Sequence, residues 1–589
     1  MATSPGHIHL QRWCGACGDV FSCGEAFVSG NEVLHHPFGD FFTNPPSTVL
    51  HDADSIQVVG SYEYPCNSVD LDILNKSTNR FFTHRCFCPP LSASKCRSAT
   101  VHADCFNLFR RSCADGIGLR RLVLAAIWRN PWRDAPTFKV SPEVDVLEMI
   151  RLAARACDLP KLMSMPPEIK CMIWQDAFDQ PSQIARYQSV LSLAADSCDQ
   201  DFDQQSSVSI RNVASWERGG RPVVEKEDAS PFIRITIDNR GVKCIERLKQ
   251  RPAFLHQRSD TELYIVETQE TLADIMVQFQ SGLACLNLGE SEVELRPWDI
   301  PAPPPMESLP LIVPSIPRTT QFSTIDLARI TGITFFISRK TGTVLGIHTH
   351  KKSAPSADAA FDRLSAQYQR QASWIYVPFP SDDRLTFFGV RWVDPNYWHL
   401  LLRFKKAGDY IVGLHSRKDL ELEDSTWPVE NQLSLVCSVS VLGSIRAISA
   451  LQQQSGIAEP PFPRINRLKL PPAPSPAFLS SAPLEHVIFI RVFTDVDIGT
   501  CRGLLLEYEN GSQRSLGECR IGLDLERTYR NPVCICIAQE PDDRRPDIKV
   551  RADCKPEHKH KSDDWKCHRM RGTLKFWFTY QQSGIEVTC

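Results

Sequence analysis

The chain is 589 residues long, with 42% hydrophobic and 23% charged residues and a formal net charge of −3 at pH 7. These values belong to a globular protein, and they exclude a disordered or fibrous chain. The near-neutral charge gives no general attraction to nucleic acid or to anionic membranes, and no basic patch with interleaved aromatic residues offsets it, so we expect neither as a partner. A chain of this length predicts three or four domains.

The expected compartment follows from two further features. The first thirteen residues lack the apolar core of a secretory signal, and the longest uncharged apolar stretch, residues 431–445, is too short to span a membrane. We therefore expect an intracellular protein, cytoplasmic or nuclear. There, the 22 cysteines are expected to be free thiols or metal ligands and not disulfides.

Residues 1–115 are predicted to form a cysteine-rich module. Cys14 and Cys17 form a CxxC pair with glycines inside and just after it, which let the backbone curl so that both thiolates face one ion. His102 and Cys105 lie three residues apart at an expected helix start, on one face of its first turn. Two ligands from a knuckle and two from a helix start make a tetrahedral Cys3His zinc site. The arrangement resembles a treble-clef module of the LIM kind, which implies a structural zinc.

Other interpretations of these cysteines stay open. About 84 residues separate the two ligand pairs, whereas compact zinc modules use shorter gaps. The intervening stretch contains Cys86, Cys88 and Cys96, which are candidates for substitute ligands or for a second site. Buried thiols that behave as small hydrophobic groups need no metal at all.

Two helical regions follow. Apolar residues recur at helical spacing from Leu119 to Ile127 and again from Val144 to Ala153, so residues 116–160 are predicted to be a helical connector. In residues 161–200, Pro166 and Pro167 fit the opening of a further helix. A second short helix is expected after it, with Ser182 as its N-cap.

The first of these short helices carries a recognisable motif. Pro166-Pro167-Glu168-Ile169, followed by Met172-Ile173 and a second short helix, resembles an F-box of the kind found in uncharacterised fungal proteins. A second fungal motif, Leu-Pro-x-Glu-Ile-Arg with a following Ile-Trp, competes with it because Ile173-Trp174 fits it. The F-box resemblance implies docking onto a Skp-type adaptor of a cullin ubiquitin ligase. The residues expected to contact the adaptor are Pro166, Ile169, Met172, Ile173 and Val190. The alternative is an amphipathic helical pair buried in its own domain.

The rest of the chain is predicted to be rich in β-structure. Alternating apolar residues flank three turn signals, at Asp238–Gly241, at Arg339–Gly342 and at Asn510-Gly511. These hairpins lie in predicted β-rich segments at residues 208–296, 321–458 and 484–589, and they suggest a sandwich, prism or propeller. Proline-rich stretches at residues 297–320 and 459–483 are expected to be linkers. A helix is expected within residues 355–371.

Catalytic motifs are absent from the sequence: it contains no GxSxG, HExxH, GxxxxGK[ST] or GxGxxG. His348 and His350 share one face of a predicted strand. A polar edge strand explains this spacing more simply than a metal site does. Near the C-terminus, metal-ligating side chains gather without regular pairing, and a metal site or a solvated loop explains them. They are Cys554, His558, His560, Cys567 and His568.

Together these features predict a multidomain α+β protein with an N-terminal zinc-type module, a small F-box-like helical segment and a large β-rich C-terminal half. The expected function is non-enzymatic: the helical segment docks the adaptor, and the β-rich half binds an unknown protein substrate. The runner-up is a lectin-like or peptide-binding β-domain in which Trp392, Tyr397 and Trp398, exposed in a predicted loop at residues 391–399, stack on a ligand. A hydrolase with a dispersed active site is the third possibility.

Overall fold

The computed structural model describes most of the chain, and every structural statement below concerns the described residues. The residues outside the description are 1–6, 10–12, 20, 22–24, 33–55, 64–79, 83–97, 114–115, 133–134, 136–137, 139, 141–144, 178–180, 199–204, 226–229, 255–256, 290–292, 306–319, 353–354, 363, 365, 395–396, 416–422, 430–433, 440–444, 451–460, 464–475, 540–547, 556–557, 561–563 and 589. None of the described helices combines the length and the apolar character that crossing a bilayer requires.

The chain divides into two compact units, Met1–Pro303 and Pro304–Cys589. The boundary falls inside the proline-rich stretch 297–320, where a linker was predicted. The finer predicted segments, at residues 1–115, 116–160, 161–200 and 208–296, all lie within the first unit. Within the stretch 459–483, β25 (Ala477–Pro483) pairs through Phe478 to Pro483 with β33 (Thr573–Phe578) inside the second unit.

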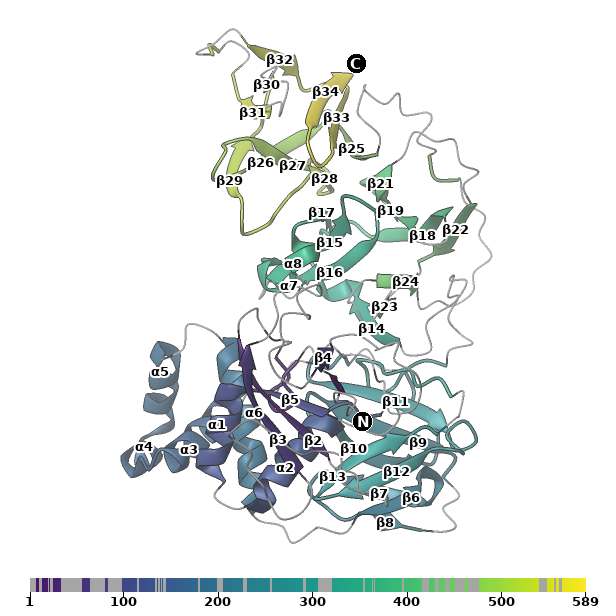
Figure 1. The fold of residues 1–589 in the computed structure, drawn as a ribbon. Helices are drawn as coiled ribbons and strands as arrows, with labels where there is room; N and C mark the ends of the chain where they lie inside the picture. The colour runs from purple at the N-terminus through teal and green to yellow at the C-terminus, as the bar shows by residue number, and fades with distance from the viewer. Residues whose placement is uncertain are drawn as a thin grey trace, which may run out of the picture. The chain divides into compact units, whose positions relative to one another are not determined.

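The N-terminal part of the first unit is a small sheet with helices against it (Figure 1). Strands β2 (Ala26–Glu32), β3 (Ile56–Glu63) and β5 (Ser98–His102) form an antiparallel sheet in the order β3-β2-β5. β1 (His7–His9) and β4 (Arg80–Phe82) form a separate parallel pair. Helix α1 (Ala103–Ser112) starts directly after β5, and α2 (Gly116–Trp128) follows it. The expected helix start at His102 is therefore confirmed.

Four more helices complete this half of the unit: α3 (Val146–Ala156), α4 (Pro160–Ser164), α5 (Pro167–Ala177) and α6 (Pro181–Cys198). Asp145 caps α3 by accepting a hydrogen bond from the Glu148 backbone N–H at 3.0 Å. α6 begins at Pro181 and not after Ser182, since proline suits the first position of a helix. α6 packs against α1, α2 and α3, whereas α5 packs against α3.

The rest of the first unit is antiparallel β-structure. One sheet has the order β11-β9-β10-β7-β8, and another has the order β13-β12-β6. The strands are β6 (Ser206–Ser209), β7 (Val213–Glu217), β8 (Val223–Val224), β9 (Phe232–Asp238), β10 (Gly241–Leu248), β11 (Glu262–Thr268), β12 (Met276–Gln280) and β13 (Leu283–Asn287). The predicted hairpin at Asp238–Gly241 joins β9 to β10. Trp132 is almost fully buried in the core between these sheets and forms a bridge to Leu286.

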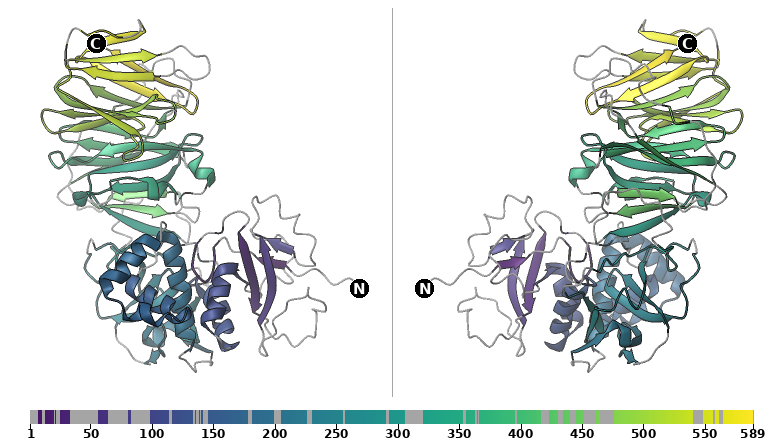
Figure 2. Two further views of the ribbon diagram at one scale, coloured as in Figure 1. Left: turned by 90° about the vertical axis from the view of Figure 1, so that its left-hand side faces the viewer. Right: turned by 90° about the vertical axis from the view of Figure 1, so that its right-hand side faces the viewer.

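The second unit is almost entirely β-structure, and its strands lie in successive layers (Figure 2). Its elements are β14 (Gln321–Asp326), β15 (Gly332–Ser338), β16 (Val344–His350), α7 (Asp358–Asp362), α8 (Ala366–Gln369), β17 (Ala372–Pro378), β18 (Leu385–Asp394), β19 (Tyr397–Phe404), β20 (Gly408–Val412), β21 (Leu414–His415), β22 (Glu423–Pro428), β23 (Ser434–Val439), β24 (Ile445–Ala450), β25, β26 (Val487–Thr494), β27 (Cys501–Tyr508), β28 (Gln513–Gly517), β29 (Leu525–Arg530), β30 (Cys534–Gln539), β31 (Ile548–Asp553), β32 (Trp565–Arg569), β33 and β34 (Ser583–Thr588).

Two of its sheets share one connectivity. The orders β20-β19-β18-β22 and β28-β27-β26-β29 each place three consecutive strands side by side and return a later strand to pair with the first. This is the Greek-key order common in sandwiches. The predicted hairpins at Arg339–Gly342 and Asn510-Gly511 are confirmed between β15 and β16 and between β27 and β28. The helix expected within 355–371 is two short helices, α7 and α8.

One continuous apolar core runs through the second unit. It includes residues from Ile325, at the first strand, to Ile585, at the last. Buried side chains recur at every second position in several strands, as in Thr573–Phe578, because one face of each strand packs inward. Both predicted segments, 321–458 and 484–589, therefore contribute to the same apolar core.

Candidate metal centres

The four predicted ligands Cys14, Cys17, His102 and Cys105 come together in the first unit. Their ligand atoms all lie within 4.8 Å of one another, and the four side chains are at most 4% exposed. The long gap between the pairs closes because β2 and β5 pair antiparallel, with Phe27 opposite His102. We call these four residues the buried cluster. The predicted donor set is therefore assembled, and it could hold a metal ion.

The CxxC segment is held as a knuckle by its own backbone. The Gly18 N–H donates to the Cys14 carbonyl at 2.7 Å, and Gly18 has a φ of +87°, which favours glycine. A Cβ on Gly15 would lie 2.4 Å from the Cβ of Ala126 in α2. Arg129 donates to the carbonyl oxygens of all three residues from Gly15 to Cys17, at 3.0–3.2 Å. The two glycines thus serve the turn and its close approach to α2.

The distances in the buried cluster suit tetrahedral coordination. The Nδ1 atom of His102 lies 3.4 Å from the Cys17 sulfur and 3.8 Å from the Cys105 sulfur. Zinc–sulfur and zinc–nitrogen bonds of ordinary length give a sulfur–nitrogen edge of about 3.6 Å in a tetrahedron. The His102 backbone N–H also donates to the Cys14 sulfur at 3.3 Å. The geometry fits a Cys3His site with four protein ligands.

Two charged residues outside the ligand set orient it. The Glu25 carboxylate lies 3.3 Å from Nε2 of His102, which favours a proton on Nε2 and leaves the Nδ1 lone pair facing the thiols. Arg186 of α6 pairs with Glu25 at 2.9 Å and donates to the Cys105 sulfur at 3.4 Å. The cysteine-rich module and α6 therefore share one polar network. Sequence reasoning missed Glu25, Arg129 and Arg186, because charges far apart in the chain give no pattern.

The protein's own charged groups do not stabilise all three thiols of this cluster as thiolates. Burial raises the pKa of Cys17, and its thiol neighbours raise it further. The pKa of Cys105 is raised by its hydrogen bond with Cys14. Burial also acts to raise the pKa of Cys14, but hydrogen bonds from Cys105, Cys17 and His102 together lower it well below its usual value. One thiolate is thus stabilised, and ionising the other two requires added positive charge, which a divalent cation supplies.

The predicted spare ligands Cys86, Cys88 and Cys96 lie outside the described residues.

A second cluster forms in the second unit, and its membership differs from the sequence-based grouping. Cys536, His558, His560 and Cys567 have ligand atoms within 4.8 Å of one another. We call them the β-sheet cluster. Cys554 is not a member, since its thiol donates to the Arg530 carbonyl instead, and His568 is not one of the converging residues. Cys536 was missed because it lies in an apolar strand far from the histidine-rich stretch.

The predicted docking face on α5 is open. Ile169, Met172 and Ile173 are 42%, 57% and 39% exposed, and Pro166 is exposed as well. Leu147 of α3, Leu159 before α4 and Met163 of α4 are exposed as well, and α3 contacts both α4 and α5. Exposed apolar side chains mark interaction sites when they form a contiguous patch.

The prediction for Val190 is wrong. Its side chain is fully buried in α6, in the apolar core that also contains Cys14, Cys17 and Cys105. Helical periodicity predicted an apolar face on α6 correctly, but the rest of the first unit covers that face. No partner can reach Val190 without unfolding the helix.

The predicted aromatic platform does not form. Trp392 and Trp398 face each other as paired residues of β18 and β19, not as loop residues. Trp398 is only 8% exposed, and Trp392 packs against the same core. Stacking of a ligand on Trp398 is therefore excluded. The side chain of Tyr397 lies outside the described residues.

Of the two histidines of β16, His350 has a structural role. His350 is buried, with Nδ1 2.6 Å from the Pro355 carbonyl and Nε2 2.7 Å from the Thr334 hydroxyl. A proton on Nδ1 donates to that carbonyl, and Nε2 then accepts from threonine. Both ring nitrogens are therefore occupied, and burial lowers the pKa of His350.

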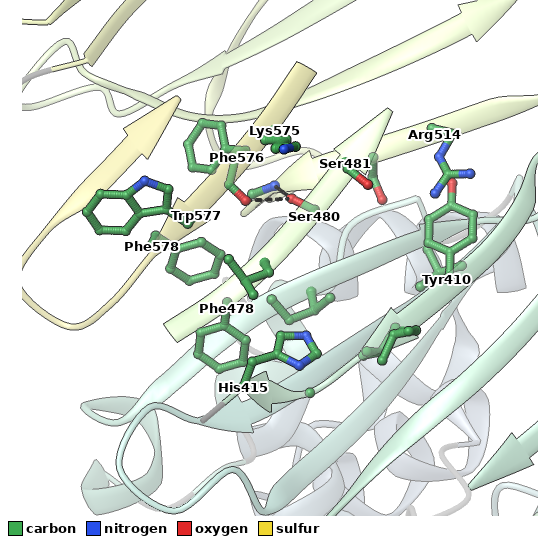
Figure 3. Close-up of a pocket in the computed structure, with 18 of the residues that line it drawn as sticks. Tyr410, His415, Phe478, Ser480, Ser481, Arg514, Lys575, Phe576, Trp577 and Phe578 are labelled. Carbon is green, nitrogen blue, oxygen red and sulfur yellow. Dashed lines mark hydrogen bonds between the residues drawn. The ribbon is translucent and has the colours of Figure 1, made fainter. Parts of the chain in front are cut away.

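A cavity of about 140 Å³ lies between strands of the second unit, lined largely by apolar side chains such as Phe478 and Phe578 (Figure 3). Two of its polar side chains are bound to the protein itself. Tyr410 donates to the Gln513 carbonyl at 2.8 Å, and Arg514 donates to the Asp409 carbonyl at 2.8 Å. Among the described residues that line this cavity we find no nucleophile paired with a base.

No protein-family model matches the chain, and no curated protein is detectably similar to it in sequence.

Proposed function

We propose that this protein is a non-enzymatic interaction protein, in which α4 and α5 dock a Skp-type adaptor of a cullin ubiquitin ligase and the second unit binds the protein to be modified. The observation that carries the proposal is the exposure of Ile169, Met172 and Ile173 directly after Pro166. A short helix whose apolar face is buried in a partner's groove is an established recognition mode.

The packing of α5 and α6 supports a division of labour between them. α6 buries its apolar face in the first unit, with Leu193 and Val190 in the core. α5 contacts the rest of the unit through α3 and leaves its own apolar residues exposed. Such exposure has no stabilising role in an isolated chain, because apolar area in contact with water costs free energy. A partner that covers α5 accounts for it.

The test is a binding measurement with a purified Skp-type adaptor. Ile169→Asp combined with Ile173→Asp is expected to weaken binding at least 30-fold, since charged groups at the centre of an apolar interface are not solvated there. The same double variant is expected to change the free energy of unfolding by no more than about 0.5 kcal/mol, because both positions face water.

The matched control is Val223→Asp with Val224→Asp, two exposed apolar residues of β8 in the same unit. This pair is expected to bind the adaptor as the native protein does. The proposal fails if the native protein does not bind the adaptor, or if the α5 variant binds unchanged. Loss of folding in the α5 variant would instead identify Ile169 and Ile173 as core residues.

We also infer that the metal of the buried cluster is zinc and that its role is structural. Three thiols and one imidazole are the donors that zinc takes in structural sites. Four protein ligands leave no open position for a substrate or an activated water. The ion would fasten the knuckle to the end of β5 and the start of α1. This placement supports a scaffold that presents α5, and it supports no catalytic role.

A further inference from the structure

We propose that the β-sheet cluster of Cys536, His558, His560 and Cys567 is a second zinc site, and that its ion fastens the segment between β31 and β32 onto the sheet. The proposal involves neither the buried cluster nor the docking face of α5, so it stands or falls separately from the proposed function.

The sheet places the two cysteines together. The strand order is β31-β30-β32, and Cys536 of β30 lies directly opposite Cys567 of β32. Side chains directly opposite each other on adjacent antiparallel strands point to the same face, with their Cβ atoms about 5 Å apart. Two thiolates at that spacing can bind one ion. Both cysteines are free thiols in the structure.

The two histidines reach the same point from outside the sheet. Their Nε2 atoms are 3.0 Å apart. The Nε2 atom of His558 lies 3.0 Å from the Cys536 sulfur and 3.3 Å from the Cys567 sulfur, and that of His560 lies 3.1 Å from the Cys567 sulfur. Two of the three elements of this site are strands of one sheet, so the cysteines are fixed and the histidine segment closes over them.

Hydrogen bonds alone do not account for this arrangement. Nδ1 of His558 lies 3.1 Å from the Lys555 carbonyl, which places the proton on Nδ1 and leaves a single lone pair on Nε2. That lone pair faces Cys536, Cys567 and His560 at once, although it can accept only one good hydrogen bond. A cation at the centre uses one lone pair from each ligand. The backbone carbonyl then holds the histidine in its ligating tautomer, as such groups do at zinc sites.

The ring of His560 is also oriented for binding. Trp565 stacks on the His560 ring, with the two ring centres 4.8 Å apart and the ring planes 10° from parallel. The Arg551 guanidinium in turn lies over the Trp565 ring, 5.3 Å from the centre of that ring. The four atoms lie slightly closer together than the edges of about 3.3–3.8 Å that zinc–ligand bond lengths require. The histidines lie outside helix and strand, so a small outward shift of their segment admits the ion.

Four protein ligands make this a closed site, so the ion acts as a clamp and not as a catalyst. Cys536 is buried, both histidines are half-buried and Cys567 is exposed. A chelator therefore reaches this ion more readily than it reaches the ion of the buried cluster. Without the ion, His558 and His560 lose the ligand that they share with the two cysteines, and we expect Lys559, which is exposed between them, to be cut more readily by trypsin.

The experiment measures zinc per chain in the purified full-length protein by elemental analysis. Cys567→Ser and His560→Ala are each expected to lower the content by one zinc per chain relative to the native protein. Cys554→Ser and His568→Ala are the matched controls, because they remove neighbouring ligand-type residues outside the cluster, and they are expected to leave the content unchanged. His560→Cys is expected to keep the ion, since it supplies a thiolate in place of an imidazole.

Two outcomes would overturn the proposal. The first is an unchanged zinc content in Cys567→Ser. The second is a disulfide between Cys536 and Cys567 in the native protein, detected by thiol titration with and without a reductant. The readout is a difference of one ion, so it holds whether or not the buried cluster also contains zinc. Trypsin digestion at Lys559, faster in Cys567→Ser than in Cys554→Ser, confirms that the ion clamps this segment.

Discussion

The buried cluster and the β-sheet cluster present similar donors in opposite settings. Three ligands of the first, Cys14, Cys17 and Cys105, belong to the apolar core of their unit. In the second unit the core extends from Ile325 to Ile585, and the cluster lies to one side of it on a three-stranded sheet. The number of metal ligands therefore does not predict how strongly a fold depends on its metal. The dependence is expected to be strong where the ligands belong to the apolar core, and weaker where they lie beside it.

The largest effect expected from this comparison is the loss of the buried ion. Cys105→Ser should unfold the cysteine-rich part of the first unit, because structural zinc contributes roughly 10–16 kcal/mol of binding free energy. That exceeds or equals the stability of an ordinary domain, about 5–15 kcal/mol. Circular dichroism and limited proteolysis should show α1 and the knuckle unprotected, while the second unit stays folded.

The control for this variant is Cys113→Ala, which removes a buried thiol from the same apolar core without touching a ligand. It should keep its zinc and lose only about 1–2 kcal/mol of stability, the cost of a small cavity. The expected difference between the clusters is contradicted if Cys105→Ser keeps its fold as Cys113→Ala does. It is also contradicted if Cys567→Ser unfolds the second unit as a whole.

The second prediction tests whether the second unit owes its stability to its own core. His399 and His415 lie buried with ring centres 4.6 Å apart. Burial lowers the pKa of His399 from 6.5 to about 4, and it lowers the pKa of His415 well below its usual value. Below pH 6.5 the two histidines therefore bind protons in the unfolded chain but stay neutral in the folded unit. The stability of the unit is fully present above pH 6.5 and falls as the pH drops towards 4.

For His399 alone this loss amounts to about 3 kcal/mol between pH 6.5 and 4. His399→Gln keeps a donor for the Leu414 carbonyl, which Nε2 contacts at 3.0 Å, and removes the titration. Urea unfolding of the second unit at several pH values should show a flatter acid dependence in this variant. Equal slopes in the native protein and in His399→Gln would contradict the pKa direction.

The sequence predicted the buried cluster because its two ligand pairs are local patterns. CxxC and HxxC bring ligands close within one turn of chain, and only the pairing of β2 with β5 had to join them. The β-sheet cluster has no such pattern. Cys536 joins it through its register opposite Cys567, and register is a long-range property. The nearest sequence signal is Cys534-Ile535-Cys536, since alternation in a strand puts both thiols on one face.

The same distinction explains the other outcomes. Turns at Asp238–Gly241 and Asn510-Gly511 were predicted correctly because hairpins are set by adjacent residues. Periodicity found apolar faces on both α5 and α6, but it does not say which face a neighbouring helix covers, so Val190 was assigned to the surface. Trp398 was placed in a loop because a strand pairing had to be known before its inward direction could be.

The smallest effect concerns the surroundings of the buried cluster and not its ligands. Glu25→Gln keeps the shape of the side chain but removes the charge beside Nε2 of His102 and the ion pair with Arg186. Partners of this kind change metal affinity by about 10–100-fold when they are replaced. We expect the zinc affinity of the Glu25→Gln variant to fall by that factor, measured by competition with a chelator. Cys17 and the other ligands should still hold one ion. Glu168→Gln, at an exposed position of α5, is the matched control and should bind zinc as the native protein does. An unchanged affinity in Glu25→Gln would mean that the packing of His102 alone fixes its tautomer, and the contrast between the clusters would then rest on burial without the help of charge.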